Sequence, residues 1–113
     1  MELHERPYGA IVVVDVHLPI DRESGATTEL VLALKRLVNS GYQLILLNVE
    51  ELTSIDSVLL GAITQAHTTA TRSGVKLKLL NVSDRLRELL VITKLDRFIE
   101  IAASEEQELD INK

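Results

Sequence analysis

Short apolar runs, separated by segments with helical periodicity, are the feature that most constrains the fold of this chain. The runs cover residues 10–18, 42–49 and 75–80. Each has the length of a strand, and the second is almost wholly apolar, as in a strand covered on at least one face. Strands that alternate with helices need crossover connections, which favour parallel pairing. The pattern therefore predicts an α/β fold.

The segments between the runs predict the helices. Leu30, Leu34 and Leu37 fall on one helical stripe. A longer helix is expected over residues 57–72, ended by Ser73-Gly74, and a short one around residues 86–90, with Ser83 or Asp84 as the cap.

A last short strand is expected over residues 98–102, and the N-terminal segment should form an edge hairpin. The prediction is thus a mixed sheet of about four or five strands with helices mainly on one face.

Length and composition limit the class of protein. The 113 residues, 46% of them hydrophobic, predict a single domain over 1–113. No apolar run approaches the roughly 20 residues that span a bilayer. The charged opening residues do not resemble a secretory signal, and cysteine is absent, so we expect a cytoplasmic protein.

Charge argues against nucleic acid as a partner. The net charge is −5, and the Lys and Arg residues are scattered rather than clustered. Acidic residues gather near the C-terminus, and we interpret that run as a solvated chain end; it consists of Glu100, Glu105, Glu106, Glu108 and Asp110.

The sequence offers no set of residues for catalysis or metal binding. His4, His17 and His67 lack the spacing of metal ligands. The adjacent Glu50 and Glu51 have no accompanying nucleophile and base. The five glycines are isolated, so no phosphate-binding loop is expected. We predict a protein that is not an enzyme and needs no cofactor or metal.

Asp56 and Ser57 lie where the second apolar run gives way to the longer helix. Both residue types are common at helix starts because their oxygens accept hydrogen bonds from the unpaired N–H groups there. The functional interpretation is that Ser57 accepts a phosphoryl group, which adds a charge of about −1.5 to −2. Thr53 and Ser54 compete as acceptors in the preceding loop.

The stretch from Asn48 to Gly61 resembles the signature of STAS domains of the anti-sigma factor antagonist family. In that family a strand ends in Asp-Leu-Ser, and Asp-Ser-Ser-Gly-Leu-Gly begins eight residues after the first Asp. Here Asn48 holds the first position, and Asp56, Ser57, Leu60 and Gly61 match the second block. Further similarity lies at residues 80–83, 87–90 and 95–97, so the resemblance covers essentially the whole chain.

The resemblance implies a regulatory protein switched by phosphorylation. A serine kinase that is also an anti-sigma factor would bind the unmodified protein, phosphorylate Ser57 and release it, and a serine phosphatase would reset it. Asp56 would shape the acceptor loop, and the expected partner-binding residues are Asp56, Ser57, Val58 and Leu59.

The chain also departs from the family pattern. Val58 and Leu59 replace Ser-Gly, Asn48 replaces Asp, and Lys94 stands where the family often has Gly. These departures leave open a constitutive scaffold or subunit, similar to stressosome STAS proteins or to the STAS subunit of lipid-transport ABC complexes. A homodimer, formed through a sheet edge or near Val58-Leu59, also remains open.

Overall fold

The computed structural model describes residues 2–17, 26–53 and 55–111. The described residues form five strands, four α-helices and one 3₁₀ turn. In chain order these are β1 (Glu2–Tyr8), β2 (Ile11–His17), α1 (Ala26–Val38), β3 (Leu44–Asn48), α2 (Ser57–Arg72), β4 (Lys76–Leu80), α3 (Asp84–Ile92), η2 (Leu95–Arg97), β5 (Glu100–Ile101) and α4 (Glu105–Ile111). The prediction of an α/β fold is confirmed.

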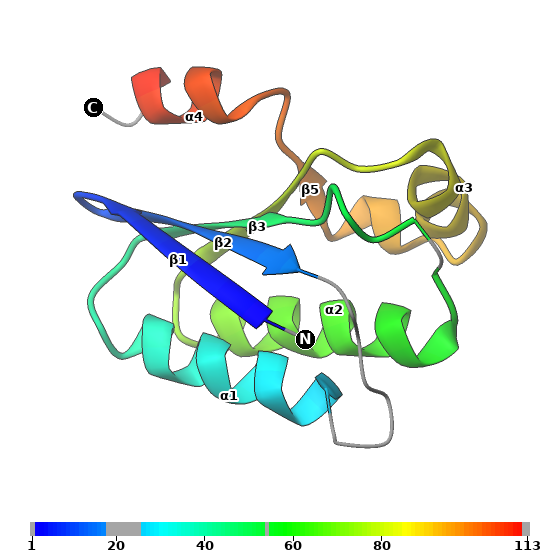
Figure 1. Ribbon diagram of the computed structural model, residues 1–113, viewed down its shortest axis with the longest axis horizontal. Helices are drawn as coiled ribbons and strands as arrows, with labels where there is room; N and C mark the ends of the chain where they lie inside the picture. Colours follow the sequence, from blue (N-terminus) through cyan, green and yellow to red (C-terminus); the bar gives the residue numbers. More distant parts are fainter. Residues whose placement is uncertain (1, 18–25, 54, 112–113) are drawn as a thin grey trace.

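The strands form one mixed sheet in the order β1-β2-β3-β4-β5 (Figure 1). β1 pairs antiparallel with β2, whereas β2, β3, β4 and β5 pair in parallel. The predicted edge hairpin at the N-terminus is therefore confirmed. The register aligns Val14 with Leu47 and Leu47 with Leu79, so the central strands place apolar residues side by side.

The two faces of the sheet are covered unequally. α1 and α2 pack on one face, against which Leu30, Leu34, Ile63 and Ala66 are buried (Figure 1). On the other face a smaller cluster meets Leu109 of α4; it consists of Ile11, Val13, Leu44, Leu46, Leu80 and Ala102. The prediction that helices lie mainly on one face is confirmed, and α4 is the helix on the opposite face.

The longest helix has the limits that the sequence predicts. α2 runs from Ser57 to Arg72 and ends where the backbone N–H of Ser73 donates to the Ala70 carbonyl. At the start of α3, the Ser83 hydroxyl accepts a hydrogen bond of 3.1 Å from the Leu86 N–H. This contact identifies Ser83, rather than Asp84, as the cap.

The last strand is shorter than predicted. Instead of residues 98–102, only Glu100 and Ile101 are in β5. The N–H groups of Phe98 and Ile99 both donate to the Leu95 carbonyl, at 3.0 and 2.9 Å. Because these amides close the 3₁₀ turn, they cannot also pair with β4.

The interpretation of the acidic C-terminal run as a solvated end is wrong for Glu105 and Glu108, whereas Glu100, Glu106 and Asp110 are exposed. α4 folds back on the sheet, where the carboxylate of Glu108, only 6% exposed, accepts from Lys78 Nζ at 3.0 Å. Glu105 accepts from Arg6 Nη2 at 2.6 Å. Lys78 is 30 residues from Glu108 along the chain, and Arg6 is 99 residues from Glu105. Patterns of neighbouring residues cannot predict contacts over such separations.

Within the described part of the chain, no helix combines the length and the apolar character needed to cross a bilayer.

We predict that Lys94→Gly stabilises the fold. Lys94 has φ +62°, in the left-handed region where a Cβ meets the following carbonyl and glycine has no such penalty. The free energy of unfolding in urea should rise by roughly 0.5–1 kcal/mol. Lys35→Gly, within α1, is the matched control and should lower it by about 1 kcal/mol. A loss of stability in Lys94→Gly would contradict this account of the turn.

Candidate functional site

Ser57 is the first residue of α2, and its side chain is exposed. The preceding residue, Asp56, is the N-cap: its Oδ1 accepts from the Leu59 N–H at 3.0 Å, and its carbonyl oxygen accepts from the Leu60 N–H at 3.0 Å. In the described structure, no hydrogen bond is recorded for the Ser57 hydroxyl. The capping role therefore belongs to Asp56, and the Ser57 hydroxyl is available to a reagent from outside.

The next two residues point in different directions. Val58 is 52% exposed, whereas Leu59 is 5% exposed and belongs to the core with Ile63 and Ala66. Successive residues of a helix are about 100° apart, so Leu59 and Val58 cannot face the same way. Of the four residues expected to bind a partner, Asp56, Ser57 and Val58 lie at the surface and Leu59 anchors the turn beneath them.

Gly61 lies exposed on α2 without a local structural reason to be glycine. Its φ is not in the left-handed region, and a Cβ built there would meet no atom within 4 Å. The surface one turn after Ser57 is therefore open to close approach by another molecule.

Asn48, at the end of β3, joins three segments of the chain. Its amide nitrogen donates to Asp15 Oδ1 at 2.7 Å. Its amide oxygen accepts from the Glu50 N–H at 3.2 Å and from Asn81 Nδ2 at 3.0 Å. The carboxyl ends of β2, β3 and β4 are thus tied together next to the loop that leads to Ser57.

An ion pair that sequence reasoning missed lies beside Asn48. Arg6 Nε donates to Asp15 Oδ2 at 2.7 Å, and Arg6 Nη2 donates to Asp15 Oδ1 at 3.0 Å. The hydrogen bonds from Arg6 lower the pKa of Asp15, against the opposing effect of burial, and Asn48 lowers it further. The same contacts raise the pKa of Arg6. The signal in the sequence that could have indicated this ion pair is Asp15 itself, the one acid within the apolar run 10–18.

A polar hollow of about 250 Å³ opens at this end of the sheet, lined by Arg6, Asp15, His17, Asn48 and both acids of the Glu50-Glu51 pair. His17 Nδ1 contacts the Glu51 carboxylate, and its ring centroid lies 6.5 Å from that of His4. Over the described residues, no group of three or more His, Cys, Asp or Glu side chains is arranged to hold a metal ion.

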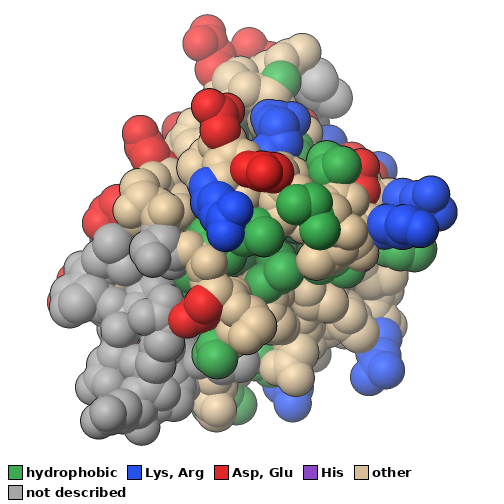
Figure 2. Space-filling model, turned by 90° about the vertical axis from the view of Figure 1, so that its right-hand side faces the viewer, with side chains coloured by type: hydrophobic (Ala, Val, Ile, Leu, Met, Phe, Trp, Pro, Cys, Tyr) green, Lys and Arg blue, Asp and Glu red, His purple; other side chains and the backbone are tan. Residues whose placement is uncertain are grey.

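An apolar surface lies on the side of the molecule that carries α3 and the first turns of α2. Figure 2 shows hydrophobic side chains gathered in the middle of this face, with basic and acidic side chains around them. The exposed large hydrophobic residues of these two helices are Val58, Val91 and Ile92, at 52%, 56% and 65% exposure. Exposed apolar groups with a charged surround are typical of a surface that binds protein.

We predict that Asp15→Asn lowers stability at neutral pH by roughly 1–3 kcal/mol, because Arg6 loses one of its two carboxylate partners and keeps only Glu105. The pKa of Asp15 is lower in the folded protein than in the unfolded chain. Its ionisation therefore stabilises the fold above the unfolded pKa of about 3.9, and the contribution is lost as the pH falls through the folded pKa.

Urea denaturation between about pH 5 and pH 2 measures this dependence. The slope with pH should be shallower in Asp15→Asn than in the parent protein. Asp96→Asn, which changes an exposed carboxylate of η2, is the control and should keep the parent slope. Equal slopes in parent and Asp15→Asn would show that this ion pair does not govern acid stability.

Comparison with known proteins identifies the fold family. A family model described as the STAS domain matches residues 6–108. No curated protein matches the sequence significantly.

Solved structures similar to this chain share its fold at low sequence identity. The NMR structure of TM1081, a Thermotoga maritima protein, has 22% identity and a TM-score of 0.78, with 94% of this chain and 84% of that chain covered. Phosphorylated SpoIIAA, described as a Bacillus cell fate determinant, has 18% identity and a TM-score of 0.74, with 99% and 100% covered. An anti-sigma factor antagonist from Mycobacterium paratuberculosis has 14% identity and a TM-score of 0.76, with 97% and 92% covered.

The family model spans most of the chain and includes both Asp56 and Ser57. This chain belongs to the STAS domain family.

Proposed function

We propose that this STAS domain is an anti-sigma factor antagonist that binds a serine-kinase anti-sigma factor through the start of α2 and is released when Ser57 is phosphorylated. The observation that carries the proposal is the exposed Ser57 hydroxyl in the first turn, directly after the Asp56 cap. The similarity in fold to phosphorylated SpoIIAA and to an anti-sigma factor antagonist supports it.

The position of Ser57 suits a phosphate chemically. The first turn of a helix carries unpaired N–H groups and a partial positive charge, which favour an anion. No side chain within the first turn of α2 is acidic. The kinase would supply the nucleotide and magnesium, because this chain acts by binding rather than by catalysis. A serine phosphatase would restore the hydroxyl, and the cycle would take place in the cytoplasm.

The binding surface would consist of Asp56, Ser57 and Val58, held in place by Leu59 in the core. Val58, where the family has serine, would give the contact an apolar part. A phosphate placed in the middle of such a contact must lose its hydration, which costs several kcal/mol unless a basic group receives it. Release of the partner follows from that cost.

A second function is supported by a specific observation. Val58 is 52% exposed, and Val91 and Ile92 of α3 are also exposed, so an apolar surface that could bind protein extends beyond Ser57. A constitutive STAS scaffold or subunit would bind its partner through this apolar surface. Such a protein could be stressosome-like or bound to the ATPase of a lipid-transporting ABC complex. Such a subunit would bind its partner, or a second copy of itself, regardless of the state of Ser57.

We predict that Ser57→Asp weakens binding of the cognate serine-kinase anti-sigma factor by roughly tenfold to a hundredfold, whereas Ser57→Ala binds like the parent protein. A carboxylate at this position imitates part of the phosphate charge, and the exposed site leaves the fold intact. Isothermal titration calorimetry measures the affinities. Ala103→Asp, which adds a carboxylate to the exposed loop between β5 and α4, is the control and should bind normally. Equal binding by Ser57→Asp and Ser57→Ala would favour the constitutive subunit.

Gly61→Ala separates folding from binding. Alanine should raise the free energy of unfolding by about 0.5–1 kcal/mol, because glycine in a helix is destabilising and the new Cβ meets nothing. The same methyl group projects into the space that a partner would enter, so kinase binding should weaken. Chemical denaturation and calorimetry on one preparation test both effects. A variant that is more stable and binds unchanged would place the partner elsewhere.

A further inference from the structure

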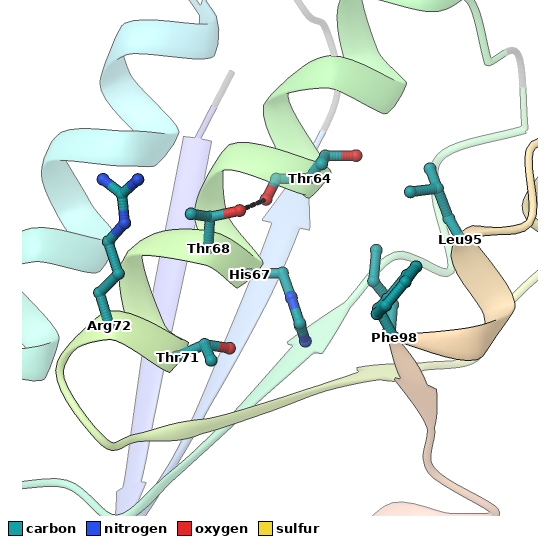
Figure 3. Close-up of a pocket in the computed structure, with 8 residues that line it drawn as sticks. Thr64, His67, Thr68, Thr71, Arg72, Leu95 and Phe98 are labelled. Atoms are coloured by element: carbon teal, nitrogen blue, oxygen red, sulfur yellow. Dashed lines mark hydrogen bonds between the residues drawn. The ribbon is translucent and has the colours of Figure 1, made fainter.

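A groove lies between the outer side of α2 and the segment 95–99, which holds η2 and the two residues that precede β5 (Figure 3). It has a volume of about 380 Å³. One wall is the α2 stripe of Thr64, His67, Thr68 and Thr71, and the other contains Leu95 and Phe98. The stripe begins seven residues after Ser57 and is therefore roughly 10–20 Å further along the helix. The groove is distinct from the surface proposed to bind the kinase.

The walls of the groove offer few free polar groups. Thr64 Oγ1 donates to the Leu60 carbonyl at 2.9 Å. Thr68 Oγ1 donates to the Thr64 carbonyl at 3.0 Å (Figure 3). Both hydroxyls are thus used within α2. Cavities of about 300–1,000 Å³ with mainly apolar walls are the usual size and character of small-molecule sites.

Phe98, the single phenylalanine of the chain, is 68% exposed at the mouth of the groove. It faces the imidazole of His67 across the gap (Figure 3). The described structure records no hydrogen bond for the His67 ring. An aromatic face and an unused nitrogen therefore line the same space, and both are groups that small ligands commonly contact.

Basic side chains gather around the groove although the chain carries a net charge of −5. Arg72 lies at one end. An adjoining hollow, which shares His67, Thr71 and Phe98, adds Lys76 and Arg97. In the described structure, no ion pair is recorded for these three cations. The carboxylate on this rim, Glu100, lies 3.6 Å from Lys78.

We propose that the groove binds a small amphipathic anion: an alkyl chain of medium length, or an aromatic ring, joined to a carboxylate. The apolar part would lie against Phe98 and Leu95, and the carboxylate would face Arg97 and Lys76 in the adjoining hollow. The charge complementarity of the rim favours an anion over a neutral or cationic ligand. This site would let a metabolite act on the domain independently of Ser57.

The test uses decanoate as the probe and decanol as its uncharged counterpart, titrated into the ¹⁵N-labelled full chain. Decanoate should shift backbone resonances of Thr64, His67, Thr71 and residues 95–100 saturably, and decanol should bind at least about threefold more weakly. Phe98→Ala should weaken decanoate binding about tenfold, and this exposed residue can be changed without unfolding the protein. Leu32→Ala, which removes an exposed leucine from α1, should bind like the parent.

Four results would overturn the proposal. They are the absence of saturable shifts, shifts centred on other residues, equal affinity in Phe98→Ala and the parent, and equal affinity for decanol and decanoate. If the resonances of the groove residues shift with protein concentration but not with decanoate, the groove binds a second copy of the chain instead. Because Ser57→Asp leaves the groove untouched, it should keep the parent affinity for decanoate whether or not the kinase proposal holds.

Discussion

The first turn of α2 is fixed at two points, and the exposure of the candidate site depends on both. The Asp56 carboxylate holds the Leu59 N–H, and the Leu59 side chain is buried in the core. With the backbone and one side chain fixed, helical geometry turns Ser57 and Val58 toward solvent. A different residue at the cap would loosen the turn. A polar residue in place of Leu59 would bury an unsatisfied group or rotate the helix.

The neighbouring polar cluster explains one departure from the STAS pattern. Asn48 stands where the family has an aspartate, and its amide donates to Asp15 at 2.7 Å. A carboxylate at the same position would face the Asp15 carboxylate, and the repulsion between them would oppose the effect of Arg6 and raise the pKa of Asp15. The amide instead connects Asp15 to Asn81, so the ends of the parallel strands are held without a second negative charge. Asn48 is thus matched to the Arg6–Asp15 ion pair.

Local patterns in the sequence predicted the elements that local interactions determine. The limits of α2 follow from an Asp-Ser start and a Ser-Gly stop, and both signals act within a few residues. The same reasoning failed for β5, because a 3₁₀ turn held by the Leu95 carbonyl competes with the strand for the same N–H groups. At the site, the position of Asp56 and Ser57 at the start of α2 followed from the sequence, but the pairing of Arg6 with Asp15 and Glu105 did not. That pairing depends on the hairpin register and on where α4 docks.

Ser57 and the groove lie toward opposite ends of α2, and the surroundings of each determine what a phosphate on Ser57 could change. At Ser57 a phosphate would add to an exposed first turn, beside the carboxylate of the Asp56 cap, and the helix dipole would offset the repulsion between the two, so folding should tolerate it. The phosphate would then weaken the free energy of binding to a partner and leave the free energy of unfolding of the domain largely unchanged. The groove near the other end differs in the source of its positive charge, which comes from the side chains of Arg72, Lys76 and Arg97 rather than from backbone N–H groups. A modification at one end and a bound anion at the other could therefore alter separate surfaces of one helix, and α2 is the element through which two inputs could reach the same partner.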